Sequence, residues 1–214
     1  ALFWLDPAFA FRDHGFRSPT GSVHPDEPVK LHLKLRKFYN PMSAKEKLSL
    51  ATQWKDEGNA AFKSEDYEFA CVKYHDALRK IGTKLLPSNG AAVVETEAEL
   101  AQLNQEATLL RATLNCNVAT CWFARGDNDK CLQFVQKTLS LDANHPKALF
   151  RKALVLERRL EFDEALRVLQ HMIDNHLGIV EEVAPAVKRI KDKNLKQSAV
   201  QTDVYKKMFW GSTT

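Results

Sequence analysis

A pattern of small and aromatic residues that recurs along the second half of this chain constrains its fold more than any other feature. The stretch NVATCWFARGDNDKCLQFVQKTL carries Ala119, Trp122 and Gly126 at the small and aromatic positions of a helix-turn-helix unit. The stretch ALVLERRLEFDEALRVL carries Ala153 and Phe162 at corresponding positions, and Ala153 follows Ala119 by 34 residues. Small residues let paired helices approach, and aromatic residues fill the gaps between neighbouring pairs. The pattern predicts helix pairs that stack one on the next.

An earlier unit, GNAAFKSEDYEFACVKYHDAL, has the same character, with Gly58 and Tyr74 at a small and an aromatic position. Gly58 precedes Ala119 by 61 residues, which is 27 more than one period. The additional residues include a loop-forming stretch, PSNG at 87–90, between two helical stretches. We therefore expect lengthened helices that are joined by a loop.

A period of about 34 residues is typical of tetratricopeptide repeats, and three repeats are enough for a stable array. We predict an all-α superhelix of three such repeats, at about 51–84, 112–145 and 146–179, within a domain at 41–180. A C-terminal capping helix is expected at 181–214. Ser43 and Glu46 have the spacing of a capping box, which predicts that the first helix begins here.

The residues before the helices have a different character. Residues 28–37, PVKLHLKLRK, alternate between apolar and polar side chains from Val29 to Arg36, which is the period of a half-buried strand. Its candidate partner is the short segment at 2–5. A strand with so few partners is not independently stable, so we do not expect residues 1–40 to fold alone.

Composition limits the class of protein. With 44% hydrophobic and 27% charged residues, the chain has the make-up of a soluble globular protein. A net charge of +4 does not predict the basic stripe of a nucleic-acid-binding protein, and no apolar run of about 18 residues is present to span a membrane. Because the chain begins with Ala1 and has no leader-like segment, we expect a piece of a longer protein without a signal peptide.

Cysteines and histidines show no metal-ligand spacing, and we expect no metal, no cofactor and no catalytic site. Four cysteines lie in helix-like stretches and are interpreted as reduced thiols in small core positions: Cys71, Cys116, Cys121 and Cys131.

Five polar residues are expected to share one face of the array, because the first helix of each pair lines its concave side. These residues are Lys55, Asn59, Asn117, Lys147 and Arg151. Lys147 and Arg151 are one helical turn apart, so their head groups converge. Two neighbouring cations repel each other; they are either ordinary solubilising charge or a binding site for an anion.

The arrangement K-x-x-x-N, then N, then K-x-x-x-R in successive repeats resembles the carboxylate clamp of co-chaperone tetratricopeptide domains. The resemblance implies binding of the C-terminal Glu-Glu-Val-Asp tail of heat-shock protein 90, with heat-shock protein 70 as a second candidate. A terminus that ends in Asp carries two adjacent carboxylates; cations can satisfy these, and Asn amides can donate to the peptide without adding repulsion. We expect micromolar affinity, about −8 kcal/mol, that weakens with salt.

A second resemblance covers residues 1–38. The stretches FWLDPAFAFRDHG and EPVKLHLKLRKF are similar to the closing segment of an FKBP-type peptidyl-prolyl isomerase domain. The family's pocket tyrosine falls on Phe11 and the following glycine on Arg12, while its other pocket residues would lie upstream. The resemblance implies a C-terminal remnant of an FKBP-like domain at 1–40, and no isomerase activity in this chain.

Together the resemblances indicate an immunophilin with tetratricopeptide repeats. The stretches HPKALFRKALVL and TDVYKKMFW are most similar to the membrane-anchored member of the FKBP-type family. This implies a cytoplasmic protein whose parent carries a C-terminal anchor and faces the cytosol on mitochondria or the endoplasmic reticulum.

Three alternatives stay open. The basic stretch at 183–209 is either a capping helix or, as the family resemblance allows, a calmodulin target. Two interpretations compete with the co-chaperone adaptor. The chain is part of an isomerase whose catalytic domain is mostly missing, or it is a scaffold whose groove binds an internal client segment. Sensitivity to amidation of a ligand's C-terminus would separate the clamp from the scaffold.

Overall fold

The computed structural model describes residues 2–5, 16–18, 21–23, 29–32, 42–86, 96–177 and 180–210. The chain divides into two compact units, Ala1–Asn40 and Pro41–Thr214.

The first unit contains two short antiparallel strand pairs. Strand β1 (Leu2–Leu5) pairs with β4 (Val29–His32) so that Leu2 lies opposite His32, and β2 (Phe16–Ser18) pairs with β3 (Gly21–Val23). The pairing expected between the segment at 2–5 and the alternating segment is therefore present. The second half of that alternating segment, and the positions Phe11 and Arg12, lie outside the described residues.

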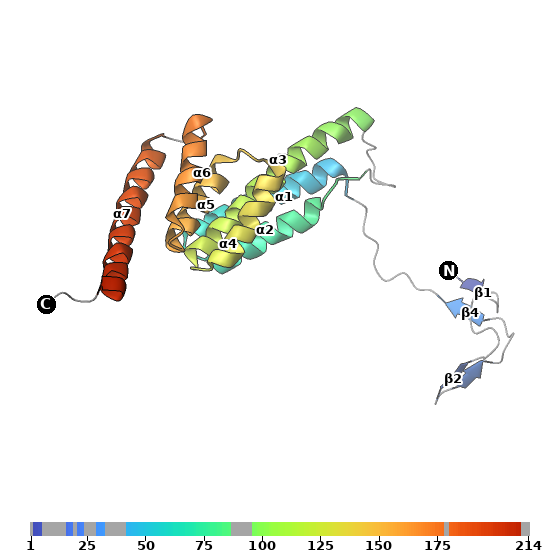
Figure 1. The fold of residues 1–214 in the computed structure, drawn as a ribbon. Helices are drawn as coiled ribbons and strands as arrows, with labels where there is room; N and C mark the ends of the chain where they lie inside the picture. The colour runs from blue at the N-terminus through green and yellow to red at the C-terminus, as the bar shows by residue number, and fades with distance from the viewer. Residues whose placement is uncertain are drawn as a thin grey trace. The chain divides into compact units, whose positions relative to one another are not determined.

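The second unit is a stack of helices, as predicted (Figure 1). Its described helices are α1 (Ala44–Lys63), α2 (Tyr67–Ile81), α3 (Glu97–Ala124), α4 (Asn128–Leu141), α5 (Pro146–Arg158), α6 (Phe162–Asp174) and α7 (Val180–Trp210). Helices α1 to α6 form three pairs, each pair contacts the next, and α7 packs on α6. The all-α repeat fold with a final capping helix is confirmed.

The turn inside each pair has the same backbone geometry. Glu65, Gly126 and Leu160 have φ values of 63°, 83° and 63°, and each follows the C-cap residue of the first helix of its pair. A left-handed residue at this position is a common way to end a helix, because the turn satisfies carbonyls of the last helical turn. Gly126 and Leu160 are 34 residues apart, so the backbone repeats the period of the sequence.

Local signals position the helix starts. The amide of Glu46 donates to Ser43 Oγ at 3.1 Å, and the amide of Ser43 donates to Glu46 Oε2 at 2.7 Å. This is the predicted capping box, and Thr96 and Glu99 form a second one at the start of α3.

Much of the additional length between the first and the second repeat lies in α3, which is 28 residues long. The side chain of Asn104 in its first half accepts a hydrogen bond from the Leu85 amide at 2.8 Å and donates to the Leu85 carbonyl at 3.0 Å. The end of the preceding repeat is thereby tied to the lengthened helix. The expected lengthening is confirmed for α3, and the loop at 87–90 lies outside the described residues.

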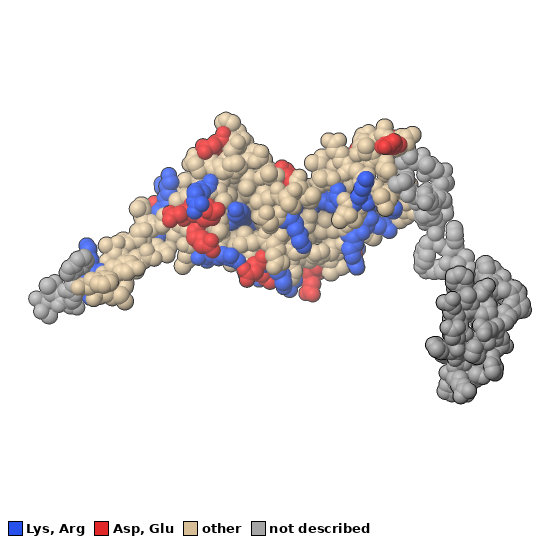
Figure 2. Space-filling view, turned by 45° about the vertical axis from the view of Figure 1, so that its right-hand side comes forward, with Lys and Arg blue, Asp and Glu red and all other residues tan. Residues whose placement is uncertain are grey.

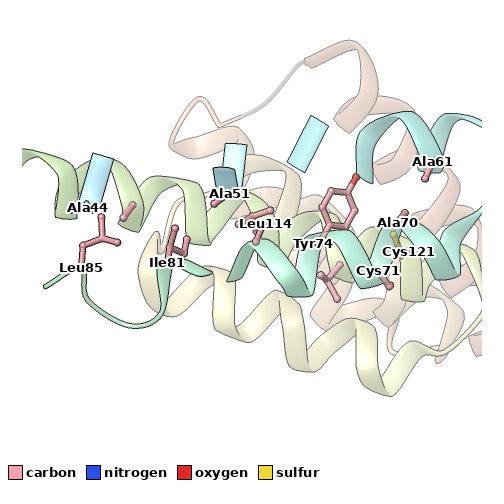
Figure 3. Close-up of a cluster of buried hydrophobic side chains, with 13 residues drawn as sticks. Ala44, Ala51, Ala61, Ala70, Cys71, Tyr74, Ile81, Leu85, Leu114 and Cys121 are labelled. Carbon is pink, nitrogen blue, oxygen red and sulfur yellow. The ribbon is translucent and has the colours of Figure 1, made fainter. Parts of the chain in front are cut away.

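The contact between α1 and α2 includes Gly58, over which the Tyr74 ring packs. A Cβ atom at this position would lie 2.6 Å from Tyr74 Cε1, and Tyr74 is only 2% exposed within the core of the first repeats (Figure 3). The aromatic ring therefore occupies the space that any other residue at position 58 would need.

The capping helix is held by a buried carboxylate. Glu157 on α5 is 8% exposed and accepts hydrogen bonds from Arg189 Nε at 2.9 Å, Arg189 Nη2 at 2.7 Å and Lys193 Nζ at 2.7 Å. Beside these contacts Val183, Ala186 and Ile190 are buried against the last repeat. Further along α7, apolar side chains such as those of Leu195 and Phe209 are exposed.

None of the described helices is both long and apolar enough to cross a membrane, and no group of three His, Cys, Asp or Glu side chains within the described residues could hold a metal ion. The four cysteines are buried free thiols.

We predict that Gly58→Ala destabilises the helical unit. In an open helix the change would add about 1 kcal/mol of stability, but here the new methyl group must displace the Tyr74 ring, at a cost of about 1–3 kcal/mol. Urea unfolding monitored by circular dichroism should show a lower midpoint. Ala60→Gly, at an exposed site on the same helix, reports the propensity effect alone, and a Gly58→Ala protein with a raised midpoint would contradict the prediction.

We predict that the attachment of α7 weakens in acid. Arg189 holds the pKa of Glu157 below its ordinary value of 4.5, with a smaller contribution in the same direction from Lys193, while burial opposes both. A carboxyl whose pKa is lower in the folded than in the unfolded state contributes stability above its unfolded pKa, and this is lost as pH falls below about 4.5.

Glu157→Gln should therefore lose about 1–3 kcal/mol near neutral pH, and its unfolding free energy should vary less with pH below 4.5 than that of the parent. Unfolding curves across this pH range provide the measurement, with Glu161→Gln at an exposed site as the control. Equal pH dependence of parent and Glu157→Gln would contradict the assignment.

Candidate functional site

The first helices of the three pairs lie next to one another. Helix α1 contacts α3, and α3 contacts α5, so side chains on one face of these helices can meet across the repeats. All five residues predicted from sequence belong to these helices: Lys55 and Asn59 to α1, Asn117 to α3, and Lys147 and Arg151 to α5.

The two asparagines are in direct contact. Asn117 Nδ2 donates to Asn59 Oδ1 at 3.2 Å, and the Tyr74 hydroxyl donates to the same oxygen at 2.8 Å. Burial raises the pKa of Tyr74, so its hydroxyl stays protonated as a donor. Because Asn59 Oδ1 accepts both bonds, the Nδ2 group of Asn59 is the part of the amide that remains to donate to a ligand.

A pocket of about 250 Å³ lies beside this contact. Side chains from α1, α2 and α3 line it: Asn59, Phe62, Lys63, Tyr74, Asn117 and Thr120. The pocket combines amide donors with a cation and an aromatic wall, which suits a small polar group such as a carboxylate.

Arg151 lies at the α3–α5 contact. Its Nη2 donates to Thr120 Oγ1 at 3.5 Å, and its Cζ atom is 4.7 Å from the centroid of the Phe123 ring. Its Nε atom is buried and has no hydrogen-bond partner within the described part of the chain. Burial lowers the pKa of Arg151, and the neighbouring Arg158 adds to this. The guanidinium is partly withdrawn from water and has donors to offer.

The other two cations, Lys147 and Lys55, differ in exposure. Lys147 is exposed, and Lys55 Nζ lies 3.4 Å from Asp56 Oδ1, with 24% of the lysine side chain exposed. Burial raises the pKa of the Cys116 thiol on α3, while the positive charges of Arg151 and Lys147 act against this. Asn59 is hydrogen-bonded to Asn117 on α3, and Arg151 contacts Thr120 on the same helix α3. Among the described contacts, neither Lys55 nor Lys147 is joined to these residues.

Sequence reasoning missed Thr120 and Phe123, which contact Arg151, and the hydroxyl of Tyr74. Thr120 lies three residues after Asn117 on α3 and therefore on the same helical face. That spacing could have predicted Thr120. The hydroxyl bond of Tyr74 depends on how α2 packs on α1, which periodicity alone does not specify.

A larger cleft, of about 920 Å³, lies between the first halves of α1 and α3. Its lining includes the carboxylates of Glu46, Glu99 and Glu106 and one lysine, Lys45. This charge does not favour an acidic ligand, so volume alone does not identify the site. On the face shown in Figure 2, Lys and Arg side chains of the helical unit are interspersed with Asp and Glu rather than gathered in a stripe.

Comparisons with known proteins agree with the fold. No family model matches the chain. It is 25% identical over 218 residues to the human peptidyl-prolyl cis-trans isomerase FKBP4, and this match covers 98% of the chain but 43% of the human protein. The C-terminal TPR-containing domain of a Plasmodium falciparum FK506-binding protein matches with a TM-score of 0.56 and 23% identity, over 74% of this chain and 96% of that one.

The chain has the fold of a tetratricopeptide-repeat region, and its sequence is similar to that of an FKBP-type isomerase. The first TPR domain of Spaghetti (RPAP3), in a structure with an HSP90 peptide of sequence SRMEEVD, also matches, with a TM-score of 0.50 and 15% identity, over 68% of this chain and 94% of that one. At these identities the solved structures establish the repeat fold alone.

We predict that Tyr74→Phe weakens both the fold and the contact between the asparagines. Removing the hydroxyl deletes the 2.8 Å bond to Asn59 Oδ1, which should cost about 1 kcal/mol because the site is partly buried. Urea unfolding gives the stability, and the hydrogen-exchange rate of the Asn59 side-chain amide reports its ordering. Tyr205→Phe, at a side chain that is 60% exposed on α7, should change neither; an unchanged amide exchange rate in Tyr74→Phe would contradict the role of the hydroxyl.

Proposed function

We propose that this chain is an adaptor module that binds the C-terminal Glu-Glu-Val-Asp tail of heat-shock protein 90 through a carboxylate clamp formed by Lys55, Asn59, Asn117, Lys147 and Arg151. The observation that carries the proposal is the contact between the two asparagine amides beside a small pocket, together with Arg151, a partly buried cation that contacts Thr120 in the lining of that pocket. A carboxylate is the ligand that such a guanidinium and such amides satisfy together.

The comparisons support the proposal without deciding it. A tetratricopeptide domain of the same fold is described in complex with an HSP90 peptide that ends in Glu-Glu-Val-Asp. The human relative is named as a peptidyl-prolyl isomerase, and the chain spans less than half of its length. Isomerase activity is therefore a property to test in the parent protein, and heat-shock protein 70 is the second candidate partner.

We also propose a cytoplasmic location, and calmodulin as a second partner. The four buried free thiols fit a reducing compartment such as the cytoplasm. The exposed apolar and basic residues of the last turns of α7 fit a calmodulin target. Membrane attachment of the parent rests on the sequence resemblance alone.

We predict that Lys147→Ala combined with Arg151→Ala abolishes binding of the pentapeptide Met-Glu-Glu-Val-Asp. Isothermal titration calorimetry should give a micromolar Kd for the parent chain and no measurable binding for the double variant, because each charged hydrogen bond contributes about 1.5–3 kcal/mol. Lys188→Ala combined with Lys191→Ala removes the same charge from exposed positions on α7 and should bind normally.

Two further titrations separate the alternatives. Amidation of the peptide's C-terminus should remove binding, since the clamp recognises the terminal carboxylate, whereas a scaffold for internal segments would bind both peptides equally. Higher salt should weaken binding because the site is open to water. No binding of the free-acid peptide at low salt would overturn the proposal.

A further inference from the structure

Arg151 is held by the neighbouring helix α3. The Thr120 hydroxyl donates to the Cys116 carbonyl at 2.9 Å, so its lone pairs remain to accept the bond from Arg151 Nη2 at 3.5 Å. The Phe123 ring, one turn further along α3, lies 4.7 Å from the guanidinium carbon. One polar and one aromatic contact thus restrict the guanidinium from the side of α3.

This position is unfavourable for a cation in the free chain. Arg158 lies over the same Phe123 ring, with its Cζ atom 3.5 Å from the ring centroid, and its charge acts against the protonated form of Arg151 together with burial. Arg158 itself donates to the Phe123 carbonyl at 2.9 Å. A charged group that burial and a neighbouring like charge disfavour is a candidate binding residue, because an anionic ligand supplies the missing interaction.

Lys147 differs in this respect. It is exposed on the first turn of α5, so its flexible side chain loses conformational entropy when it orders around a ligand. A guanidinium that is already oriented loses less entropy for each hydrogen bond that it forms.

We propose that Thr120 and Phe123 are positioning residues that orient Arg151 toward a carboxylate of the ligand, and that ligand affinity depends more on Arg151 than on Lys147. The inference rests on the proposed function, since the ligand is the same acidic peptide terminus.

The first experiment measures the Kd of Met-Glu-Glu-Val-Asp by calorimetry. Thr120→Val keeps the shape of the side chain and should weaken binding about three- to ten-fold, the equivalent of one hydrogen bond, while Thr120→Ser restores the hydroxyl and should bind as the parent does. Thr113→Val is the matched control, because the Thr113 hydroxyl donates to the Leu109 carbonyl at 3.1 Å in the same way but lies on an exposed part of α3.

Arginine substitutions separate positioning from folding. Arg151→Met keeps the apolar stem and should weaken binding about ten-fold or more, with an unfolding midpoint equal to or above that of the parent because an unpaired, partly buried charge is removed. Lys147→Met should weaken binding less. Adding Thr120→Val to Arg151→Met should have no further effect on Kd. If Thr120→Val weakens binding by the same factor in the parent chain and in Arg151→Met, the positioning role is overturned.

A ligand-free measurement keeps this inference distinct from the proposed function. In ¹H–¹⁵N spectra recorded at low temperature, a held guanidinium shows separate Nη–H signals, and those of Arg151 are identified by their disappearance in Arg151→Met. They should be present in the parent and averaged in Thr120→Val and Phe123→Leu. If the parent chain fails to bind the peptide, the proposed function fails; if the Nη–H signals do not respond to Thr120→Val, the positioning of Arg151 fails.

Discussion

The packing of Tyr74 against Gly58 connects the stability of the first repeat to the chemistry of the candidate site. The ring fills the space above a residue that has no side chain, and its hydroxyl continues to Asn59, which in turn contacts Asn117 on the next repeat. A single aromatic residue on α2 thus packs over Gly58 and also holds the side-chain amide of the next residue of α1. Core packing and site geometry cannot be changed independently here.

Arg151 shows the opposite relation between stability and function. Its guanidinium is partly buried, its neighbour Arg158 is also a cation, and its Nε lacks a partner within the described residues. Such an arrangement does not favour the folded state, because removing a charge from water is unfavourable without compensation. The contacts with Thr120 and Phe123 hold the Arg151 guanidinium in this position although its burial is unfavourable.

The last repeat is closed by a different kind of interaction. Glu157 is buried on α5 and compensated by Arg189 and Lys193 from α7, so breaking one side would leave an uncompensated charge inside the protein. This gives α7 a defined register on the last repeat, while its later turns expose apolar side chains such as Met208 and Phe209. The two halves of α7 therefore have separate tasks: the first completes the core, and the second presents a surface.

The sequence by itself determined the repeat, the start of the first helix and the helix on which each of the five polar residues lies. Period and capping are local properties, and both the 34-residue spacing and the Ser43–Glu46 box can be read directly from the chain. Only the tertiary structure decided which of those five residues meet. Asn59 and Asn117 are 58 residues apart and touch because α1 and α3 pack side by side, and the burial of Arg151 and its contacts with Thr120 and Phe123 follow from how α5 packs on α3. Periodicity assigns a side chain to a face of its helix, but the distance between two faces depends on the side chains that fill the space between the helices.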